Sequence, residues 1–232
     1  MERGAIWDLD GVLADTGQMH YLAWTRVLAE YGLPFSWETF ETTFGMNNTG
    51  ILALLFGRAS DPGLVAEIGE RKETAFRQAV LAVPGHIQPL PGVRDWLERL
   101  RAAGFRQAIA SSAPPANIDL LVGELGLRGC FDALVSGFDL PGKPDPATFL
   151  AAARAIGVPA GRCVVVVDAV HGVVGARRAG MRCIAVTTTS PAAALAAADL
   201  VVARLDALPI DAFDRLVDYD KRPPGSPSLR GS

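Results

Sequence analysis

Two aspartates separated by a single leucine stand near the start of this 232-residue chain, in the segment Asp8-Leu9-Asp10-Gly11. They directly follow the apolar run Ala5-Ile6-Trp7, and alternate residues of a strand point to the same side, so both carboxylates can face one site. Two carboxylates at close range repel each other unless a cation lies between them or one of them holds a proton. The pair therefore suits an aspartyl nucleophile with an acid/base helper and a hard metal ion. A strand followed by an Asx-type turn is the structural alternative, because Asp-Gly pairs commonly mark turns.

Three later apolar runs are followed by polar residues that a phosphate and a magnesium ion could use. These are Ser111 and Ser112 after residues 108–110, Lys143 in the segment Gly142-Lys143-Pro144-Asp145-Pro146, and Asp168 after residues 163–167. Serine hydroxyls and helix-entry amides can hold an anionic oxygen, and a lysine in a rigid turn can neutralise phosphate charge. Asp168 could complete a magnesium site with Asp8 and the backbone of Asp10. Each residue alone has an ordinary role as a helix cap, a surface charge or a loop cap, but their order at four strand ends favours one shared site.

The elements that must position these residues alternate between strand and helix from residue 92 onward. Short apolar runs predict strands at residues 4–9, 107–110, 133–136, 163–167 and 183–187, and helical spacing predicts helices at 92–103, 115–125, 146–156 and 172–179. Continuous β-branched runs without polar alternation indicate strands covered on both faces, hence an α/β fold with a parallel sheet flanked by helices. In such sheets, sites form at the carboxyl ends of the strands.

The stretch from residue 16 to residue 83 contains no convincing strand. Its apolar residues begin to recur near the helical period of 3.6 from about residue 19, at Leu22, Trp24, Val27, Leu28 and Tyr31. Ser36 and Asp61 are expected to be N-caps of further helices. We therefore expect an all-helical insert over 16–83, a core made of 1–15 and 84–218, and a disordered tail rich in Pro, Gly and Ser over 219–232.

Composition excludes several classes of partner. The formal net charge is −3 and charges of both signs are interspersed, so we expect no nucleic-acid binding. The apolar stretches are interrupted well short of a membrane span, and the N-terminus runs directly into a strand without an apolar secretory region. The three cysteines are widely spaced, as expected of reduced thiols in a cytosolic protein. We expect a cytoplasmic monomer or weak homodimer without a membrane partner.

Four segments together carry a more specific signature. They are Asp8-Leu9-Asp10-Gly11-Val12-Leu13-Ala14-Asp15-Thr16, Ala110-Ser111-Ser112, Gly142-Lys143-Pro144-Asp145-Pro146, and Asp168 with Gly172 and Ala179-Gly180-Met181. Their order and spacing resemble the motifs of haloacid dehalogenase superfamily phosphohydrolases, in the β-phosphoglucomutase-like branch, and the resemblance extends from Ala5 to Val217. It implies a Rossmann-like core with a helical cap inserted after the first strand, in agreement with the insert expected over 16–83.

The resemblance implies a role for each matched residue. Asp8 resembles the nucleophile that becomes an aspartyl-phosphate, and Asp10 resembles the acid/base that protonates the leaving oxygen and then activates water. Dehalogenases of the superfamily lack the second aspartate, so Asp10 favours phosphoryl transfer over carbon–halogen cleavage. Ser111 and Lys143 resemble the phosphate-binding pair, with Lys143 also offsetting the charge of nearby carboxylates. Mg²⁺ is the implied cofactor, with Asp8, Asp10 and Asp168 as its expected ligands.

Further residues are expected around the phosphate and the leaving group. Gly11 and Ser112 are placed beside the phosphate, and His20 resembles a substrate-side histidine of the mutase branch, with a hydrogen-bonded helix histidine as the alternative. Asn48 belongs to the segment Gly45-Met46-Asn47-Asn48-Thr49-Gly50, which has asparagines in the region where mutase-like members carry an arginine that binds a second phosphate. An asparagine can bind a sugar hydroxyl but cannot make a bidentate charged contact with phosphate. Lys72, in a run of charged residues, is expected to be solvated, with contact to the substrate as the alternative.

Val167 is a second departure, because the family's fourth motif commonly has an acid at that position. Fewer negative ligands should weaken magnesium binding. Three functions are therefore open: a magnesium-dependent phosphatase of a small phosphorylated metabolite such as a sugar phosphate, a mutase or phosphotransferase that passes the phosphoryl group to a sugar hydroxyl, and a non-catalytic sensor of a phosphorylated ligand. The missing cap arginine favours the phosphatase, since a mutase must hold a bisphosphate intermediate.

Overall fold

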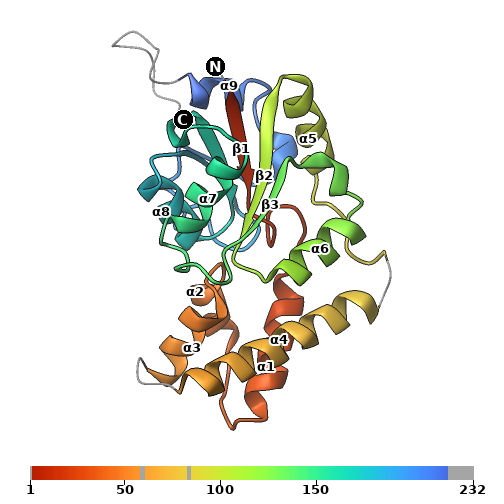
Figure 1. Ribbon diagram of the computed structural model, residues 1–232, viewed down its shortest axis with the longest axis vertical. Coiled ribbons are helices and arrows are strands. Elements are labelled where there is room, and N and C mark those ends of the chain that lie inside the picture. Colours follow the sequence, from red (N-terminus) through yellow and green to blue (C-terminus); the bar gives the residue numbers. More distant parts are fainter. Residues whose placement is uncertain (1, 58–60, 83–84, 219–232) are drawn as a thin grey trace.

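The computed structural model describes residues 2–57, 61–82 and 85–218 of the chain. The tail expected over 219–232 and the expected boundary at 83–84 lie outside these residues. Figure 1 shows two lobes, a sheet flanked by helices and a smaller helical lobe below it. None of the helices in the described ranges is both long enough and apolar enough to cross a membrane.

The larger lobe is built on a six-stranded parallel sheet with the strand order β3-β2-β1-β4-β5-β6. Its strands are β1 Arg3–Trp7, β2 Phe105–Ser111, β3 Ala133–Ser136, β4 Cys163–Val167, β5 Arg182–Val186 and β6 Leu200–Val202. The two middle strands, β1 and β4, are buried along almost their whole length. Their apolar side chains face away from water on both sides of the sheet, which is why helices cover both faces.

The order in which the chain adds strands to the sheet reverses between β1 and β4. From β1 the chain adds β2 and β3 on one side, and it then crosses back to place β4 on the other side. Ligands of parallel α/β sheets bind in the crevice at such a switch point, outside the carboxyl ends of the strands. Asp8 follows β1 and Asp168 follows β4, so the strand order brings these two sequence-distant residues to one crevice.

Two apolar layers hold the helices of the larger lobe against the sheet. The helices are α5 Val93–Ala102, α6 Pro115–Glu124, α7 Ala147–Ala155, α8 Val170–Arg178 and α9 Ala212–Val217, with short 3-10 helices η1 Arg128–Cys130, η2 Ala160–Arg162 and η3 Leu205–Ala207. Side chains of α5, α6 and α9 form one layer, and those of α7 and α8 form the other. Along β4, Val164 and Val166 belong to the first layer and Val165 and Val167 to the second, as the two-residue period of a strand requires.

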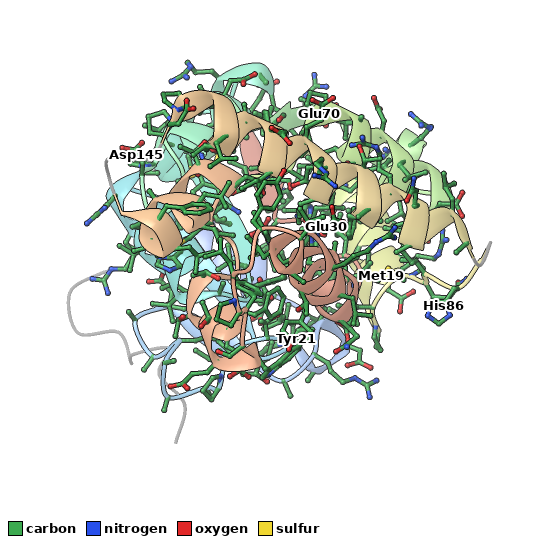
Figure 2. The ribbon with its side chains drawn as sticks, turned by 90° about the horizontal axis from the view of Figure 1, so that it is seen from below. Met19, Tyr21, Glu30, Glu70, His86 and Asp145 are labelled. Carbon is green, nitrogen blue, oxygen red and sulfur yellow. The ribbon has the colours of Figure 1, made fainter. Side chains whose placement is uncertain are left out.

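The helices between β1 and α5 form a cap. Its helices are α1 Gly17–Ala29, α2 Trp37–Thr43, α3 Asn48–Phe56 and α4 Pro62–Ala82. The cap has an apolar cluster of its own, in which the rings of Trp24, Phe35, Phe40 and Phe44 pack together. Seen from the cap end, α1 and α4 lie side by side across the core (Figure 2). The expected α/β fold with an inserted all-helical cap is confirmed.

Most elements lie within about two residues of their expected positions. β3 and β4 coincide with the expected ranges, and Ser36 caps α2, because its side chain accepts a hydrogen bond from the Thr39 amide at 3.1 Å. The first strand ends at Trp7 rather than at residue 9, and α8 begins at Val170 rather than at residue 172. β6 and α9 were not expected, because elements of three and six residues are too short to show a periodic pattern.

Candidate active site

Asp8 leaves the central strand β1 at its carboxyl end, where the core meets the cap. Its amide still donates to the Val166 carbonyl of β4 at 3.0 Å, so the sheet determines its position. The chain then turns at Gly11, whose φ of 73° lies in the left-handed region that favours glycine. A Cβ atom on Gly11 would lie 1.8 Å from Oδ2 of Asp168. The missing side chain at this position therefore allows the loops after β1 and β4 to come into contact.

Lys143 forms a buried ion pair with Asp8. Its Nζ lies 2.5 Å from Oδ2 of Asp8 and 3.3 Å from the Ala110 carbonyl at the end of β2. The exposed fraction is 2% for Lys143 and 5% for Asp8, so water screens this pair little. Burial raises the pKa of Asp8, and Lys143 opposes that rise by stabilising the carboxylate. The lysine thus favours the ionised form of Asp8, which is the form that can act as a nucleophile.

Asp168 adds a second buried carboxyl group beside Asp8. Its Oδ2 accepts a hydrogen bond from the Thr189 hydroxyl, whereas its Oδ1 is buried and has no hydrogen-bond partner among the described residues. Burial, and then the negative charge of Asp8, raise the pKa of Asp168 to about 8. An unpartnered carboxylate oxygen next to a second carboxylate is stabilised by a divalent cation. The two residues therefore fit the magnesium ion that the sequence implies.

The carboxylate of Asp10 is engaged on the cap side of the crevice. Its Oδ1 accepts hydrogen bonds from the Thr16 hydroxyl at 2.6 Å and from Nε2 of His20 at 3.0 Å. Burial alone would raise the pKa of Asp10, but His20 and Thr16 hold it below its ordinary value. Within residues 2–57, 61–82 and 85–218, no three Asp, Glu, His or Cys side chains converge as a metal would require. The magnesium ligands expected from the sequence, which are Asp8, the backbone of Asp10 and Asp168, stay a prediction.

The two expected phosphate-binding serines both line the pocket next to Asp8. Ser111 ends β2, and its Oγ accepts a hydrogen bond from the Ala113 amide at 3.1 Å, which is a local cap of the following turn. Ser112 donates from Oγ to the Gly45 carbonyl of the cap at 2.9 Å. Ser112 therefore links the core to the cap, while Ser111 lies closer to the end of the sheet.

Val167 does not face the crevice. Its side chain is fully buried in the apolar layer beneath α7 and α8, and a Cβ atom on Gly172 would lie 2.8 Å from its Cγ1. Successive residues at the end of β4 point to opposite sides, so Asp168 reaches the crevice while Val167 packs beneath α8. The valine at this position therefore supports the packing of α8 on the sheet.

Lys72 is not the solvated charge that the sequence predicted. Its exposed fraction is 3%, and its Nζ lies 2.9 Å from both Nδ1 of His20 and Oε1 of Glu73. An ammonium group only donates, so Nδ1 of His20 accepts, and these partners assign the ring proton to Nε2, which faces Asp10. The three side chains form a continuous chain of hydrogen bonds from α4 through α1 to Asp10.

Glu73 and Asn117 complete this buried network, and neither was expected from the sequence. Asn48 donates from Nδ2 to Oε1 of Glu73 at 2.9 Å, and Asn117 of α6 donates to Oε2 at 2.6 Å. The network therefore joins the cap to the core. A signal for Lys72 was present, because Phe76 follows it by four residues and such residues share one helix face. The charged residues around Lys72 predict an exposed helix face, whereas Phe76 indicates a buried one.

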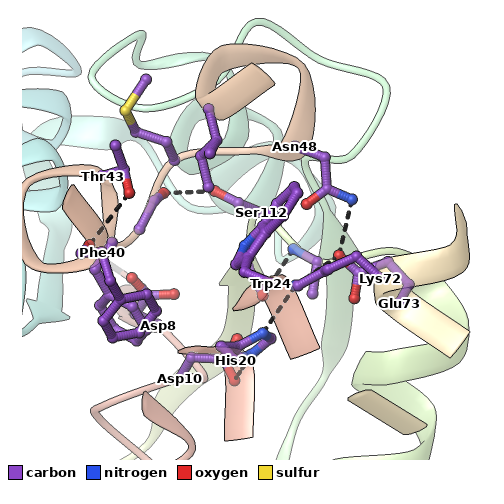
Figure 3. A pocket seen from close by; sticks show the side chains of 16 residues that line it. Asp8, Asp10, His20, Trp24, Phe40, Thr43, Asn48, Lys72, Glu73 and Ser112 are labelled. Atoms are coloured by element: carbon purple, nitrogen blue, oxygen red, sulfur yellow. Dashed lines mark hydrogen bonds and ion pairs between the residues drawn. The ribbon is translucent and has the colours of Figure 1, made fainter. Parts of the chain in front are cut away.

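A pocket of about 50 Å³ lies where these groups meet (Figure 3). Its polar lining comes from the core through Asp8, Asp10, Ser111 and Ser112, and from the cap through His20, Asn48, Lys72 and Glu73. The core and the cap thus both contribute polar groups to one pocket.

Known proteins are similar to this chain in sequence and in fold. The family model for haloacid dehalogenase-like hydrolases matches residues 2–180. The chloroplastic 5-amino-6-(5-phospho-D-ribitylamino)uracil phosphatase of Arabidopsis thaliana is 30% identical over 221 residues, which are 94% of this chain and 58% of that protein. The β-phosphoglucomutase of Bacillus subtilis is 31% identical over 216 residues, which are 90% of this chain and 92% of that protein. The solved β-phosphoglucomutase of Clostridium difficile has a TM-score of 0.85 at 23% identity, covering 96% of this chain and 100% of that one.

The family match covers most of the chain and includes the segments that carry Asp8, Ser111, Lys143 and Asp168. The crystal structure of the Clostridium protein is similar over both the core and the cap. The expected family is thereby confirmed by sequence and by fold. The chain belongs to the haloacid dehalogenase-like hydrolase family, in its β-phosphoglucomutase-like branch.

Proposed function

We propose that this protein is a Mg²⁺-dependent phosphatase that hydrolyses a small phosphomonoester, such as a sugar phosphate, through an aspartyl-phosphate. Family membership and the phosphatase among its relatives make it a phosphoric monoester hydrolase. The finer proposal rests on one pocket that contains both carboxylates, in which Lys143 forms an ion pair with Asp8 and His20 donates a hydrogen bond to Asp10. Two carboxyl groups in different environments can take different roles, one as nucleophile and one as acid/base.

In the first half-reaction the Asp8 carboxylate attacks phosphorus, and the bond between phosphorus and the leaving oxygen breaks. Asp10 donates a proton to that oxygen, so the alcohol leaves uncharged. Lys143 and Ser111 lie beside Asp8, where an ammonium and a hydroxyl group would donate to the phosphate oxygens and stabilise their negative charge. The products are an aspartyl-phosphate and the free alcohol.

In the second half-reaction a water molecule attacks the same phosphorus atom while Asp10, now a carboxylate, takes its proton. The bond between phosphorus and Asp8 breaks and inorganic phosphate is released. Thr16 and His20 orient Asp10 for both steps. They hold its pKa low in the substrate-free protein, whereas the negative charge of a bound phosphate raises the pKa of a nearby carboxyl group. Asp10 therefore takes up its proton as the substrate binds.

Mg²⁺ would be held by the carboxylates of Asp8 and Asp168 and by the backbone oxygen of Asp10. The unpartnered Oδ1 of Asp168 supports this placement, and all three donors are the oxygen ligands that Mg²⁺ prefers. When bound, the ion would supply positive charge that offsets the repulsion between these carboxylates and the phosphate.

Two features of the pocket favour hydrolysis over the alternatives. Asn48 offers no bidentate charged contact to a second phosphate, and Glu73 binds the ammonium of Lys72. Among the described residues that line the pocket, a bisphosphate intermediate of a mutase therefore finds no unpaired lysine or arginine. The alternative of a non-catalytic sensor rests on Val167 in place of an acid. The side chain of Val167 packs in the apolar layer outside the crevice. The phosphatase is therefore the function that these residues support best.

Release of inorganic phosphate from a panel of sugar and polyol phosphates, with Mg²⁺ and with EDTA, tests the proposal. We expect free phosphate and free alcohol only when Mg²⁺ is present. Phosphorus NMR of the products separates the mutase, because an isomerised sugar phosphate without free phosphate would contradict hydrolysis. Tight ligand binding by calorimetry without any turnover would identify a sensor instead.

Asp168→Asn is expected to stabilise the metal-free protein at pH 8. The raised pKa of Asp168 means that the folded state binds more protons than the unfolded state between pH 4 and about 8. The free energy of unfolding therefore falls as pH rises through that window, by up to roughly 1.4 kcal/mol per pH unit. Asparagine cannot ionise, so the variant lacks this loss. Thermal unfolding in EDTA measures this. The Tm of the variant minus the Tm of the wild type should be larger at pH 8 than at pH 5.

The same pair of proteins tests the proposed metal site. Mg²⁺ should raise the Tm of the wild type, because it binds the folded state, and should raise that of Asp168→Asn much less. An equal Mg²⁺-dependent rise in Tm in both proteins would show that Asp168 is not a ligand of the metal. A variant that is less stable than the wild type at pH 8 in EDTA would contradict the pKa argument.

A further inference from the structure

Thr189 is a residue of the crevice that none of the sequence motifs included. It lies in the loop after β5, and its hydroxyl donates a hydrogen bond to Oδ2 of Asp168. A Cβ atom on Gly11 would lie 3.0 Å from Oγ1 of Thr189, so this hydroxyl also lies beside the turn that follows Asp8. The loop after β5 thereby contributes a polar group to the crevice between β1 and β4.

The two oxygens of the Asp168 carboxyl group have different surroundings. Oδ2 is bound by Thr189, whereas Oδ1 is buried and has no hydrogen-bond partner within residues 2–57, 61–82 and 85–218. Asp168 is only 1% exposed, and an unpaired oxygen at such a buried position is costly unless a further group binds it. The protein therefore fixes one oxygen of Asp168 and leaves the other to a ligand.

We propose that Thr189 is a positioning residue of the metal site. It restricts Asp168 to a contact through Oδ1 alone, and it thereby shifts the preference of the site towards Mg²⁺ over Ca²⁺. Thr189 acts through Asp168 and is not itself a ligand. The inference rests on the proposed Mg²⁺-dependent phosphatase and adds how the cation of that same site is selected.

The coordination chemistry of the two cations gives the physical reason. Mg²⁺ requires a nearly regular octahedron of oxygens at about 2.0–2.1 Å, whereas Ca²⁺ takes about six to eight oxygens at about 2.3–2.6 Å and accepts a carboxylate through one or both of its oxygens. A carboxylate that can rotate freely offers both oxygens to the larger ion. With Oδ2 engaged by the Thr189 hydroxyl, Asp168 offers one oxygen in a fixed direction, which suits the smaller ion.

The small number of acidic groups makes this restriction important. In the part of the chain that the structure describes, no cluster of three or more Asp, Glu, His or Cys side chains could hold a metal. Val167, next to Asp168, packs in the apolar layer, and Lys143 already engages Oδ2 of Asp8. Affinity depends on the number of charged ligands and on the rigidity of the site. A site with few carboxylates therefore depends more on how firmly each one is held.

Thr189→Val tests this role, because valine has the shape of threonine but cannot donate to Asp168. The Tm as a function of MgCl₂ or CaCl₂ concentration, in protein first freed of metal with EDTA, gives the Kd of each cation. Loss of a group that orients a metal ligand typically weakens metal binding by about 10–100-fold. We expect that loss for Mg²⁺ and a smaller one for Ca²⁺, so the Kd for Ca²⁺ divided by the Kd for Mg²⁺ should fall at least about 10-fold.

Two further variants show whether the hydroxyl group is responsible. Thr189→Ser keeps a hydroxyl that can donate to Asp168 and should restore the wild-type ratio of the two Kd values. Thr188→Val is the matched control, because it makes the same change at the neighbouring residue, which lines a separate small pocket with Val12 and Leu90. Its ratio should equal that of the wild type.

The outcomes separate this inference from the function on which it rests. If neither cation raises the Tm of the wild type, the proposed metal site is overturned, and this inference with it. A Mg²⁺-dependent rise in the wild type with an unchanged Kd ratio in Thr189→Val would leave the metal site standing and overturn the role of Thr189. Equal weakening of both cations would also overturn it, since that is the result of a general loss of structure. If Thr189→Val does not fold, the same ratio in Thr189→Ala decides.

Activity is measured separately from cation binding. Absence of phosphate release from the whole substrate panel would overturn the phosphatase, whatever the two Kd values show.

Discussion

Asp8→Asn is expected to lower kcat/KM for phosphate release by at least about 10⁴-fold, as the loss of a catalytic nucleophile does in other hydrolases. An amide oxygen is a poor nucleophile, so the aspartyl-phosphate does not form. Asparagine keeps the shape of aspartate, and its oxygen can still accept the hydrogen bond from Lys143. The effect should therefore lie in the chemistry and leave the fold intact. Phosphate release at saturating Mg²⁺, with the best substrate of the panel, measures it.

Asp139→Asn is the control for this variant. Asp139 is exposed in the loop after β3, so the same change there should leave kcat/KM within about twofold of the wild type. Circular dichroism spectra of both variants should match the wild type. Equal activity in Asp8→Asn and the wild type would rule out Asp8 as the nucleophile and would end the proposed mechanism.

Lys143→Met is expected to lower both activity and stability. It removes the ammonium that lies 2.5 Å from the Asp8 carboxylate in a buried site, and breaking such a pair costs about 3–5 kcal/mol of unfolding free energy. Loss of a charge that stabilises the transferring phosphate should also lower kcat by roughly 10³-fold. Chemical denaturation and phosphate release, measured on the same preparation, test both effects.

The pH dependence of the residual activity distinguishes two roles of Lys143. Without the lysine, burial raises the pKa of Asp8 against only the hydrogen bond from the Leu9 amide. A larger fraction of Asp8 is then protonated and inactive at neutral pH, so the activity of Lys143→Met should rise with pH more steeply than that of the wild type. Arg154→Met, which removes an exposed cation of α7, should change neither the profile nor the stability. Activity of Lys143→Met within about threefold of the wild type would contradict the assignment.

The residues of the site on the core side could largely be predicted from the sequence, because they directly follow recognisable strands. Asp8 comes after β1, Ser111 ends β2 and Asp168 comes after β4, and strand ends of a parallel sheet meet at one edge. The valine run of β4 is identifiable by its uninterrupted apolar character alone. Local pattern and a general rule of sheet architecture together were sufficient for these positions.

The residues on the cap side of the site could not be predicted from the sequence in the same way. Lys72 and Glu73 stand within a run of charged residues, which locally favours an exposed helix face, yet both are buried. Their burial depends on partners from α1, α3 and α6, namely His20, Asn48 and Asn117. No pattern within α4 specifies those partners, because a buried charge is stable only when distant hydrogen-bonding groups are present.

By itself the sequence determined the alternation of strands and helices, the helical insert, and the residue types that end each strand. These features depend on side-chain periodicity and local backbone preference, which a short segment carries within it. Only the tertiary structure decided that Asp168 lies against the turn at Gly11, that Asp10 is bound by His20, and that Val167 points beneath α8. Strand order and the docking of the cap place such groups, and both result from packing between segments far apart in the chain.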